Sequence, residues 1–295
     1  MRRRRKIVKK HRENFAKRRR RNRTIVLLVS LAVILAAGYW LSNFSYSPKI
    51  SIETVNVRGA SIVSEEAVRK IFDQQTAAPF LGLFSRKNAL LLPYSKIKNE
   101  ISESFRTVAA VNVSFESPNK AVLSLKEREP FTLWCLSVSA TATTAPPPQN
   151  PSNCFYADKT GFIFAEAPKF SGDVFVIWSG FVSNRGEGGA VGWPVGQNIL
   201  SEADFVALNK FMENLSGLGL KISSVAEVSQ SEVELRAART GTKILIDRRI
   251  AYDQTLQNLD SIIAAKQVEF KGKFLERLEQ IDARFGGKAF IKIKN

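Results

Sequence analysis

The 295-residue sequence contains one histidine and two cysteines, and these scarcities exclude whole classes of chemistry. The only histidine is His11, so no later residue can be an imidazole base or an imidazole metal ligand. Ser/His triads and His-based zinc sites are therefore excluded from the rest of the chain. The motifs GxSxG and GxxxxGK[ST] are also missing, and the glycine-rich segment 186–196 lacks the Lys-Ser/Thr ending of a phosphate-binding loop. We expect no cofactor, no metal and no catalytic residue.

Acidic residues are almost missing from the first 23 positions. This tail holds 14 Lys and Arg side chains and one acid, Glu13, which leaves about +4 of the formal net charge of +17 for the other 272 residues. A nucleic-acid-binding domain spreads basic residues over a folded face, so binding to nucleic acid is disfavoured. The tail is interpreted as a topology signal that also attracts anionic lipid. Docking of a cytoplasmic partner and binding of the tail to nucleic acid without sequence preference are the alternatives. The topology signal includes Arg18, Arg19, Arg20 and Arg21.

Charge is absent altogether from positions 24 to 48, and residues 25–41 are almost wholly apolar. A helix that continues this run to Phe44 is about 30 Å long, the thickness of a hydrocarbon core. The sequence therefore predicts one transmembrane helix over 24–44. A cleaved signal peptide and a buried core helix are alternatives, but the basic leader is too long for the first and the flank too charged for the second. The membrane-anchoring residues are expected to include Ile25, Trp40 and Leu41.

The positive-inside rule leaves the basic end in the cytoplasm and exports the remainder, which makes a single-pass type II protein. Cys135 and Cys154 then form an even pair outside the cytoplasm, where disulfides persist. Residues 137–153 between them are rich in Ser, Thr, Ala and Pro, and we expect a flexible insert whose base the disulfide clamps. Two free thiols are the alternative, and a redox role is disfavoured because CxxC spacing is missing.

The exported part has the pattern of two α+β domains. Residues 50–128 read as β-α-α-β-β, which suits a three-stranded sheet with two helices on one face. Residues 129–295 read as a mixed β-domain with helices packed on one side. In the second domain, Ser201 with Asp204 resembles a capping box, and Asp253 is expected to cap the next helix. From Ile281 onward we favour a strand over a continued helix.

Several segments carry a family resemblance. "VNVRGASIVSEEAVRKIF" (55–72) looks like the opening of a POTRA domain. "VLSLKEREPFTLW" (122–134) and "FYADKTGFIF" (155–164) are similar to the "ERxPxAxW" and "DxxGxvF" segments of the bacterial division protein family FtsQ/DivIB. The end of the chain is similar to that family's closing motif, with Ala283 in place of the usual Leu and a shortened turn. The matching residues are Glu127, Arg128, Pro130, Trp134, Asp158, Gly161, Phe164, Ile281, Asp282, Arg284, Phe285 and Gly287.

The last strand is the expected working surface. The resemblance implies that this terminal hairpin pairs with an FtsB-type membrane protein, which coils with an FtsL-type protein. The physical mode is strand addition to a free sheet edge. An ordinary edge guarded by lysines is the alternative. The expected partner-binding residues are Arg284, Phe285, Gly287, Lys288, Phe290 and Lys292.

Together these features lead to the expectation of a non-enzymatic scaffold of the bacterial septum in the plasma (inner) membrane. Its POTRA-like domain and tail are expected to contact other division proteins. One alternative is a membrane-anchored cell-envelope enzyme that acts on the wall. A transport adaptor with a POTRA domain is a weaker alternative, because repeated POTRA patterns and a barrel pattern are both missing from the sequence.

Overall fold

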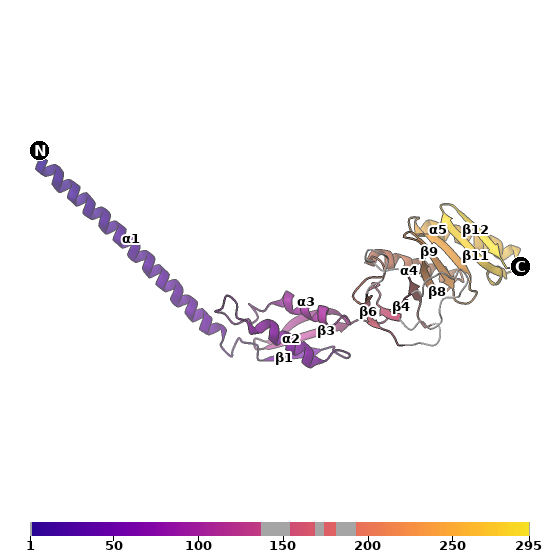
Figure 1. The fold of residues 1–295 in the computed structure, drawn as a ribbon, viewed down its shortest axis with the longest axis horizontal. Coiled ribbons are helices and arrows are strands. Elements are labelled where there is room, and N and C mark those ends of the chain that lie inside the picture. The colour runs from indigo at the N-terminus through magenta and orange to yellow at the C-terminus, as the bar shows by residue number, and fades with distance from the viewer. Residues whose placement is uncertain (1, 137–153, 169–173, 181–192, 295) are drawn as a thin grey trace. The chain divides into compact units, whose positions relative to one another are not determined.

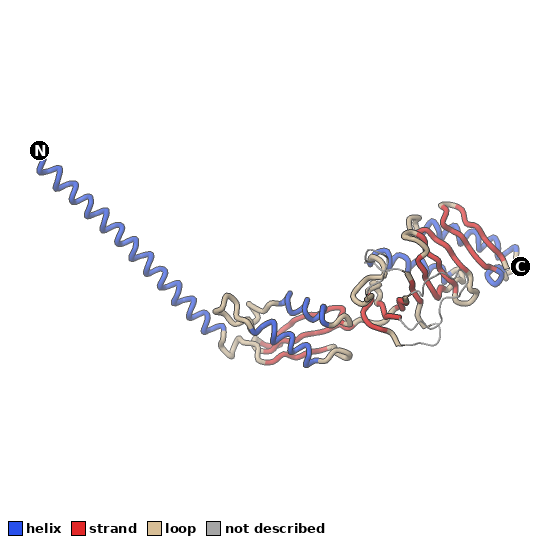
Figure 2. Tube along the Cα trace, viewed as in Figure 1, coloured by secondary structure: helices blue, strands red, loops and turns tan. Residues whose placement is uncertain are grey.

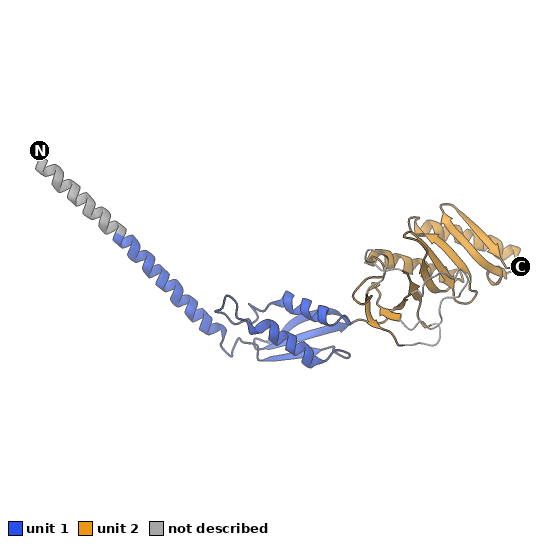
Figure 3. Cartoon of the chain, viewed as in Figure 1, with its two compact units in different colours: residues 1–127 blue, residues 128–295 orange. Residues whose placement is uncertain are grey.

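A computed structural model describes residues 2–136, 154–168, 174–180 and 193–294, with side chains from Arg21 onward. The chain divides into two compact units, Met1–Glu127 and Arg128–Asn295 (Figure 3). The expected flexible insert lies outside the described residues. The side chains of the basic tail before Arg21 also lie outside them, so only the helical backbone of Arg18, Arg19 and Arg20 is described.

The N-terminal helix α1 runs over Arg2–Ser45 and therefore continues from the basic tail through the apolar run. Its segment Arg21–Ser45 is long and apolar enough to cross a membrane, and no residue of its apolar 18-residue window is buried inside the protein. Ile25, Trp40 and Leu41 are all exposed on this segment. By length and composition this segment is a candidate membrane anchor.

The rest of the first unit is a small sheet with two helices (Figure 2). The sheet has the order β1-β3-β2, with β1 parallel and β2 antiparallel to the central strand. Ile97 and Ile101 of α3 and Phe72 of α2 are buried in the core with the strands. The predicted β-α-α-β-β order is confirmed. The elements are β1 (Thr54–Arg58), α2 (Glu65–Ala77), α3 (Tyr94–Ser104), β2 (Val108–Ser117) and β3 (Lys120–Glu127).

The second unit is built on one mixed nine-stranded sheet with the order β12-β11-β10-β9-β8-β7-β4-β5-β6. Helices α4 and α5 lie along one face of this sheet (Figure 1). The strands of its first half are β4 (Thr132–Cys135), β5 (Cys154–Ala157), β6 (Ile163–Glu166) and β7 (Ile177–Ser179). The remaining elements are α4 (Glu202–Gly217), β8 (Ile222–Glu227), β9 (Glu232–Ala237), β10 (Lys243–Asp247), α5 (Tyr252–Glu269), α6 (Phe274–Arg277), β11 (Leu278–Phe285) and β12 (Lys288–Ile293).

The cap predicted from the sequence is present at helix α4 and absent at helix α5. The Ser201 hydroxyl accepts the N–H of Asp204 at 3.2 Å, as the capping pattern predicts. The prediction that Asp253 caps α5 is wrong, because the N-cap position is Ala251. Asp253 instead lies in the first turn, where its charge still interacts favourably with the helix dipole.

The preference for a strand near the C-terminus is confirmed, with β11 beginning at Leu278. Helical periodicity is misleading here because the strand register shifts between Leu278 and Gln280. This bulge lets Leu278 and Ile281, three residues apart, both face the core, where neither is exposed. A three-residue spacing of apolar residues therefore arises from a bulged strand.

Candidate functional site

Strand β12 is the last strand of the sheet and pairs only with β11 among the described residues. The N–H of Lys294, just after β12, donates to the carbonyl of Arg277 at 2.7 Å. Main-chain groups alternate in direction along a strand, so the N–H and C=O groups of Phe290 and Lys292 point towards β11, like the N–H of Lys294. The main-chain groups of Ala289 and Ile291 therefore lie on the outer side of β12, which we call the open edge.

Side chains on β12 alternate between half-buried and exposed. Ala289, Ile291 and Ile293 are half-buried and pack against the core, whereas the residues between them are exposed. Phe290 is 61% exposed. Ala289 and Ile291, whose main-chain groups lie on the open edge, are thus positioned by packing against the core. The residues between them present their side chains to solvent.

Two aromatic residues of the hairpin make a small apolar patch beside the open edge. The rings of Phe285 and Phe290 meet edge to face, with centroids 5.4 Å apart, and both are exposed. Between them the chain turns through Gly286 and Gly287. Gly287 has a φ of 80°, a conformation that favours glycine. The glycine thus allows the tight turn that brings the two rings together.

The charged residues of the hairpin are largely engaged within the protein. The Arg284 guanidinium contacts Asp282 at 2.6 Å and Glu232 of β9 at 3.3 Å. These contacts raise the pKa of Arg284, and the hydrogen bonds from Arg284 lower the pKa of Asp282 against the opposing effect of burial. The Lys292 ammonium lies 2.6 Å from Glu279. The contacts of Arg284 therefore link β11 to β9, which lies two strands away in the sheet.

The opposite edge of the sheet, at β6, is covered where the chain is described. The N–H of Ile163 donates to the carbonyl of Gln197 at 2.9 Å, and the N–H of Gly196 donates to the carbonyl of Ile163 at 2.7 Å. Phe162 and Asn198 form a further bridge. The segment 196–198 therefore occupies the main-chain groups through which another strand could pair at this point.

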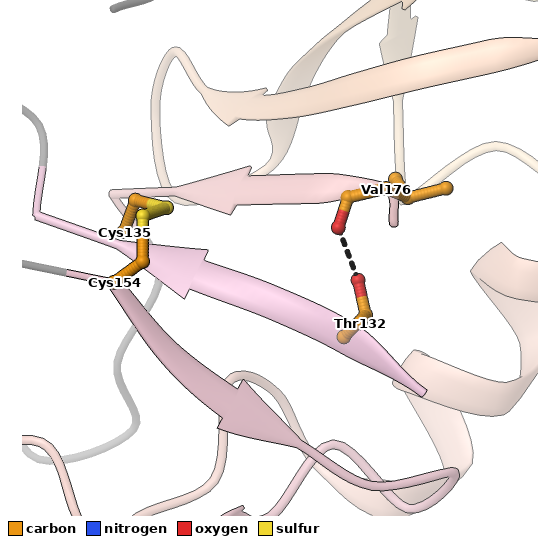
Figure 4. Close-up of a disulfide and its surroundings, with 4 residues drawn as sticks. All are labelled: Thr132, Cys135, Cys154 and Val176. Carbon is orange, nitrogen blue, oxygen red and sulfur yellow. Dashed lines mark hydrogen bonds between the residues drawn. A yellow bond between two sulfur atoms is a disulfide. The ribbon is translucent and has the colours of Figure 1, made fainter. Parts of the chain in front are cut away.

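A disulfide joins Cys135 and Cys154, which lie directly opposite each other on β4 and β5 (Figure 4). Their Cα atoms are 4.1 Å apart. On the other side of β4, the Thr132 hydroxyl donates to the carbonyl of Val176. The predicted pairing is therefore present, and neither cysteine is a free thiol.

Arg128 and Asp158, two residues of the resemblance motifs, form an ion pair that is mostly shielded from solvent. The guanidinium carbon of Arg128 also lies 4.1 Å from the centre of the Phe162 ring. Asp158 accepts the N–H of Thr160 at 2.8 Å and that of Phe162 at 3.2 Å. Burial alone would raise the pKa of Asp158, but hydrogen bonds from Thr160 and Arg128 lower it overall. These residues order the β5–β6 turn.

Glu127 has a comparable role at the end of the first unit. Its carboxylate accepts the N–H groups of Ser61, Ile62 and Val63 at 3.0, 2.9 and 3.1 Å, and also the Ser61 hydroxyl. Burial opposes ionisation, but these hydrogen bonds lower the pKa of Glu127 to about 2. The motif residues Glu127, Arg128 and Asp158 therefore have structural roles.

Comparisons with known proteins do not add a family to these observations. A scan against protein-family models finds no match to the chain, and a search of curated proteins finds none either.

Two features of interest are not anticipated by the sequence. Glu232 gives no local signal of its pairing with Arg284, which is 52 positions away. The loop between α2 and α3 contacts the end of α1, and its only sequence signal is the apolar run "PFLGLF" at 79–84.

Proposed function

We propose that the chain is a membrane-anchored scaffold of the bacterial division machinery, without catalytic activity of its own. In this proposal α1 crosses the plasma (inner) membrane with its basic end in the cytoplasm, and both units are extracytoplasmic. The open edge of β12 captures an extended segment of an FtsB/FtsL-type partner, itself a single-span coiled-coil protein. The observation that carries the proposal is the contrast between β12, whose outer side pairs with no other described residue, and β6, whose first residue Ile163 pairs with Gly196 and Gln197.

The chemistry of the open edge favours strand addition. Ala289 and Ile291 offer main-chain donors and acceptors at fixed spacing, because their half-buried side chains pack against the core. Phe290 and Phe285 offer an apolar contact for one side chain of the added strand. Lys288 and Lys292 lie on the same side of β12 as Phe290, so a segment that alternates apolar and acidic residues would complement it.

The first unit supports the family resemblance through its topology. Its β-α-α-β-β order, with a central last strand and two helices in one core, is the arrangement expected of a POTRA-like domain. We assign it contacts with other division proteins, to which the basic tail can contribute. Because all partners share one membrane, their effective concentrations are high, and modest pairwise contacts can hold an assembly together.

The test uses proline to remove one donor from the open edge. Ile291→Pro removes an N–H that points away from β11, so the β11–β12 pairing should persist. We expect co-purification of the FtsB/FtsL-type partner from detergent-solubilised membranes to fall about tenfold or more, the equivalent of about 1.4 kcal/mol. Phe290→Asp should have a similar effect, because it places a charge in the apolar contact.

Ile291→Val is the matched control, since it keeps the N–H and a branched apolar side chain, and it should retain the partner. The partner is identified by mass spectrometry as a single-span coiled-coil chain. Undiminished recovery with both Ile291→Pro and Phe290→Asp would exclude β12 from the mechanism.

A further inference from the structure

The loop between α2 and α3, residues 78–93, exposes large apolar side chains although it belongs to a folded unit. Leu81 is 75% exposed and Leu83 is 56% exposed. The main chain between them folds back on itself: the N–H of Phe80 donates to the carbonyl of Phe84 at 2.7 Å, and the reverse bond measures 3.0 Å. We call residues 80–84 the leucine turn. Its apolar groups point outward while much of its backbone hydrogen bonding is internal.

Hydrogen bonds join this turn and the residue that follows it, Ser85, to the C-terminal end of α1. The Ser42 hydroxyl donates to the carbonyl of Leu83 at 2.6 Å. The Ser45 hydroxyl accepts the N–H of Ser85 at 3.0 Å, and both of these serines are buried. The leucine turn is therefore held against the last turn of the apolar helix.

The position of Ser42 and Ser45 along α1 sets the depth of the leucine turn. An apolar helix that begins at Ile25 needs about 20 residues to cross a hydrocarbon core of about 30 Å, which brings the far boundary near Phe44. Trp40 and Phe44 are exposed here and stack on each other, as expected of rings at a membrane interface. The leucine turn bonded to this part of α1 lies at the same level.

We propose that the leucine turn inserts into the lipid leaflet at the C-terminal end of α1 and forms a second membrane contact of the first unit. The inference depends on the proposed function in one respect, namely that α1 spans the membrane. Lipid is the occupant that the structure favours, because the exposed leucines continue the exposed apolar surface of α1. Insertion is compatible with the backbone, because lipid offers no hydrogen-bond partners and these main-chain groups already have them. The N–H and C=O groups of Phe80 and Phe84 bond to each other, and the Ser42 hydroxyl donates to the carbonyl of Leu83.

The experiment places an environment-sensitive fluorophore at single introduced cysteines of the full-length chain in vesicles of phosphatidylethanolamine and phosphatidylglycerol. The native cysteines are joined in a disulfide and do not react with the label. Some of the lipid carries a nitroxide quencher near the top of its acyl chains. At Leu81→Cys and Leu83→Cys we expect about half of the fluorescence to be quenched, as for side chains buried about 5–10 Å into the boundary.

Ile62→Cys is the matched control, because Ile62 is an aliphatic residue with 70% exposure. The N–H of Ile62 donates to Glu127, the last residue of β3. Lys120, at the other end of β3, pairs with the start of β1, the strand that follows α1. A probe there should show little quenching. A probe at Leu35→Cys, in the middle of the apolar run, reports whether α1 itself is in the bilayer.

The outcomes separate the inference from the proposal beneath it. Quenching at positions 35, 81 and 83 but not at 62 supports insertion of the leucine turn. Quenching at 35 with values at 81 and 83 equal to that at 62 overturns the inference and leaves the membrane anchor intact. The same result is expected if a partner protein, rather than lipid, covers the leucine turn. Absence of quenching at 35 overturns the anchor and the inference together.

Discussion

The two edges of the nine-stranded sheet are built differently. At the β6 end, segment 196–198 pairs with the outermost strand, a disulfide joins β4 to β5, and a shielded ion pair holds the β5–β6 turn. At the β12 end, the outer side of the last strand has no partner among the described residues, and the strand carries an exposed phenylalanine. The comparison teaches that constraints on stability gather at one edge, while the groups able to bind another chain gather at the other.

The largest loss of stability is expected when the disulfide at the closed end is removed. The double variant Cys135→Ser, Cys154→Ser releases a loop with a sequence separation of 19 and should lower the free energy of unfolding by about 3 kcal/mol. Denaturant unfolding of the full-length chain in detergent, followed by the fluorescence of the buried Trp134 and Trp178, measures this loss. A loss below about 1 kcal/mol would mean that the disulfide does not secure the closed end.

A smaller loss is expected from Asp158→Asn, which removes the charge that faces Arg128. We expect about 2 kcal/mol at neutral pH, because the guanidinium is left without its shielded partner. The folded pKa of Asp158 lies below its ordinary value, so its ionised form stabilises the fold above about pH 4, and this contribution disappears as the pH falls through the folded pKa.

The difference in stability between wild type and Asp158→Asn should therefore shrink in acid, which pH-dependent unfolding can measure. Asp260→Asn, at an exposed position of α5, is the control and should cost little at any pH. A difference that is constant between neutral and strongly acidic pH would show that the charge of Asp158 is not the cause.

The smallest effect on stability is expected from Phe290→Ala at the open edge. Because Phe290 is largely exposed and contacts Phe285 only edge to face, the cost should be about 0.5 kcal/mol or less. The same variant should weaken capture of the partner. Unfolding and co-purification measured on one preparation check both parts. If Phe290→Ala costs as much stability as loss of the disulfide, the β12 edge also stabilises the fold, and the proposed contrast between a stabilising edge and a binding edge is wrong.

Much of the local structure could be predicted from the sequence, because it depends on neighbouring residues. The alternation along β12 follows from Ala289, Ile291 and Ile293, and the cap at Ser201 follows from residue types at fixed spacing. The facing positions of Cys135 and Cys154 follow from two apolar strands on either side of a segment that lacks large apolar residues. The apolar helix follows from the run without charge.

The order of the strands could not be predicted from local patterns. Strand β7 lies between β4 and β8, parallel to both, and β11 pairs in parallel with β10 across the connection that contains α5. These neighbours depend on packing between distant segments. The cover over β6 and the pairing of Glu232 with Arg284 depend on the same long-range order, so the contrast between the two edges appears only in three dimensions.

Glu127 and Arg128 are adjacent in the sequence, yet each is fastened within its own unit, the first to residues 61–63 and the second to Asp158. Both residues at the boundary are therefore ordered by side-chain contacts within their own units. Pulling on either unit from this point would have to break the hydrogen bonds of Glu127 or the ion pair of Arg128 before the chain could be drawn out of that unit.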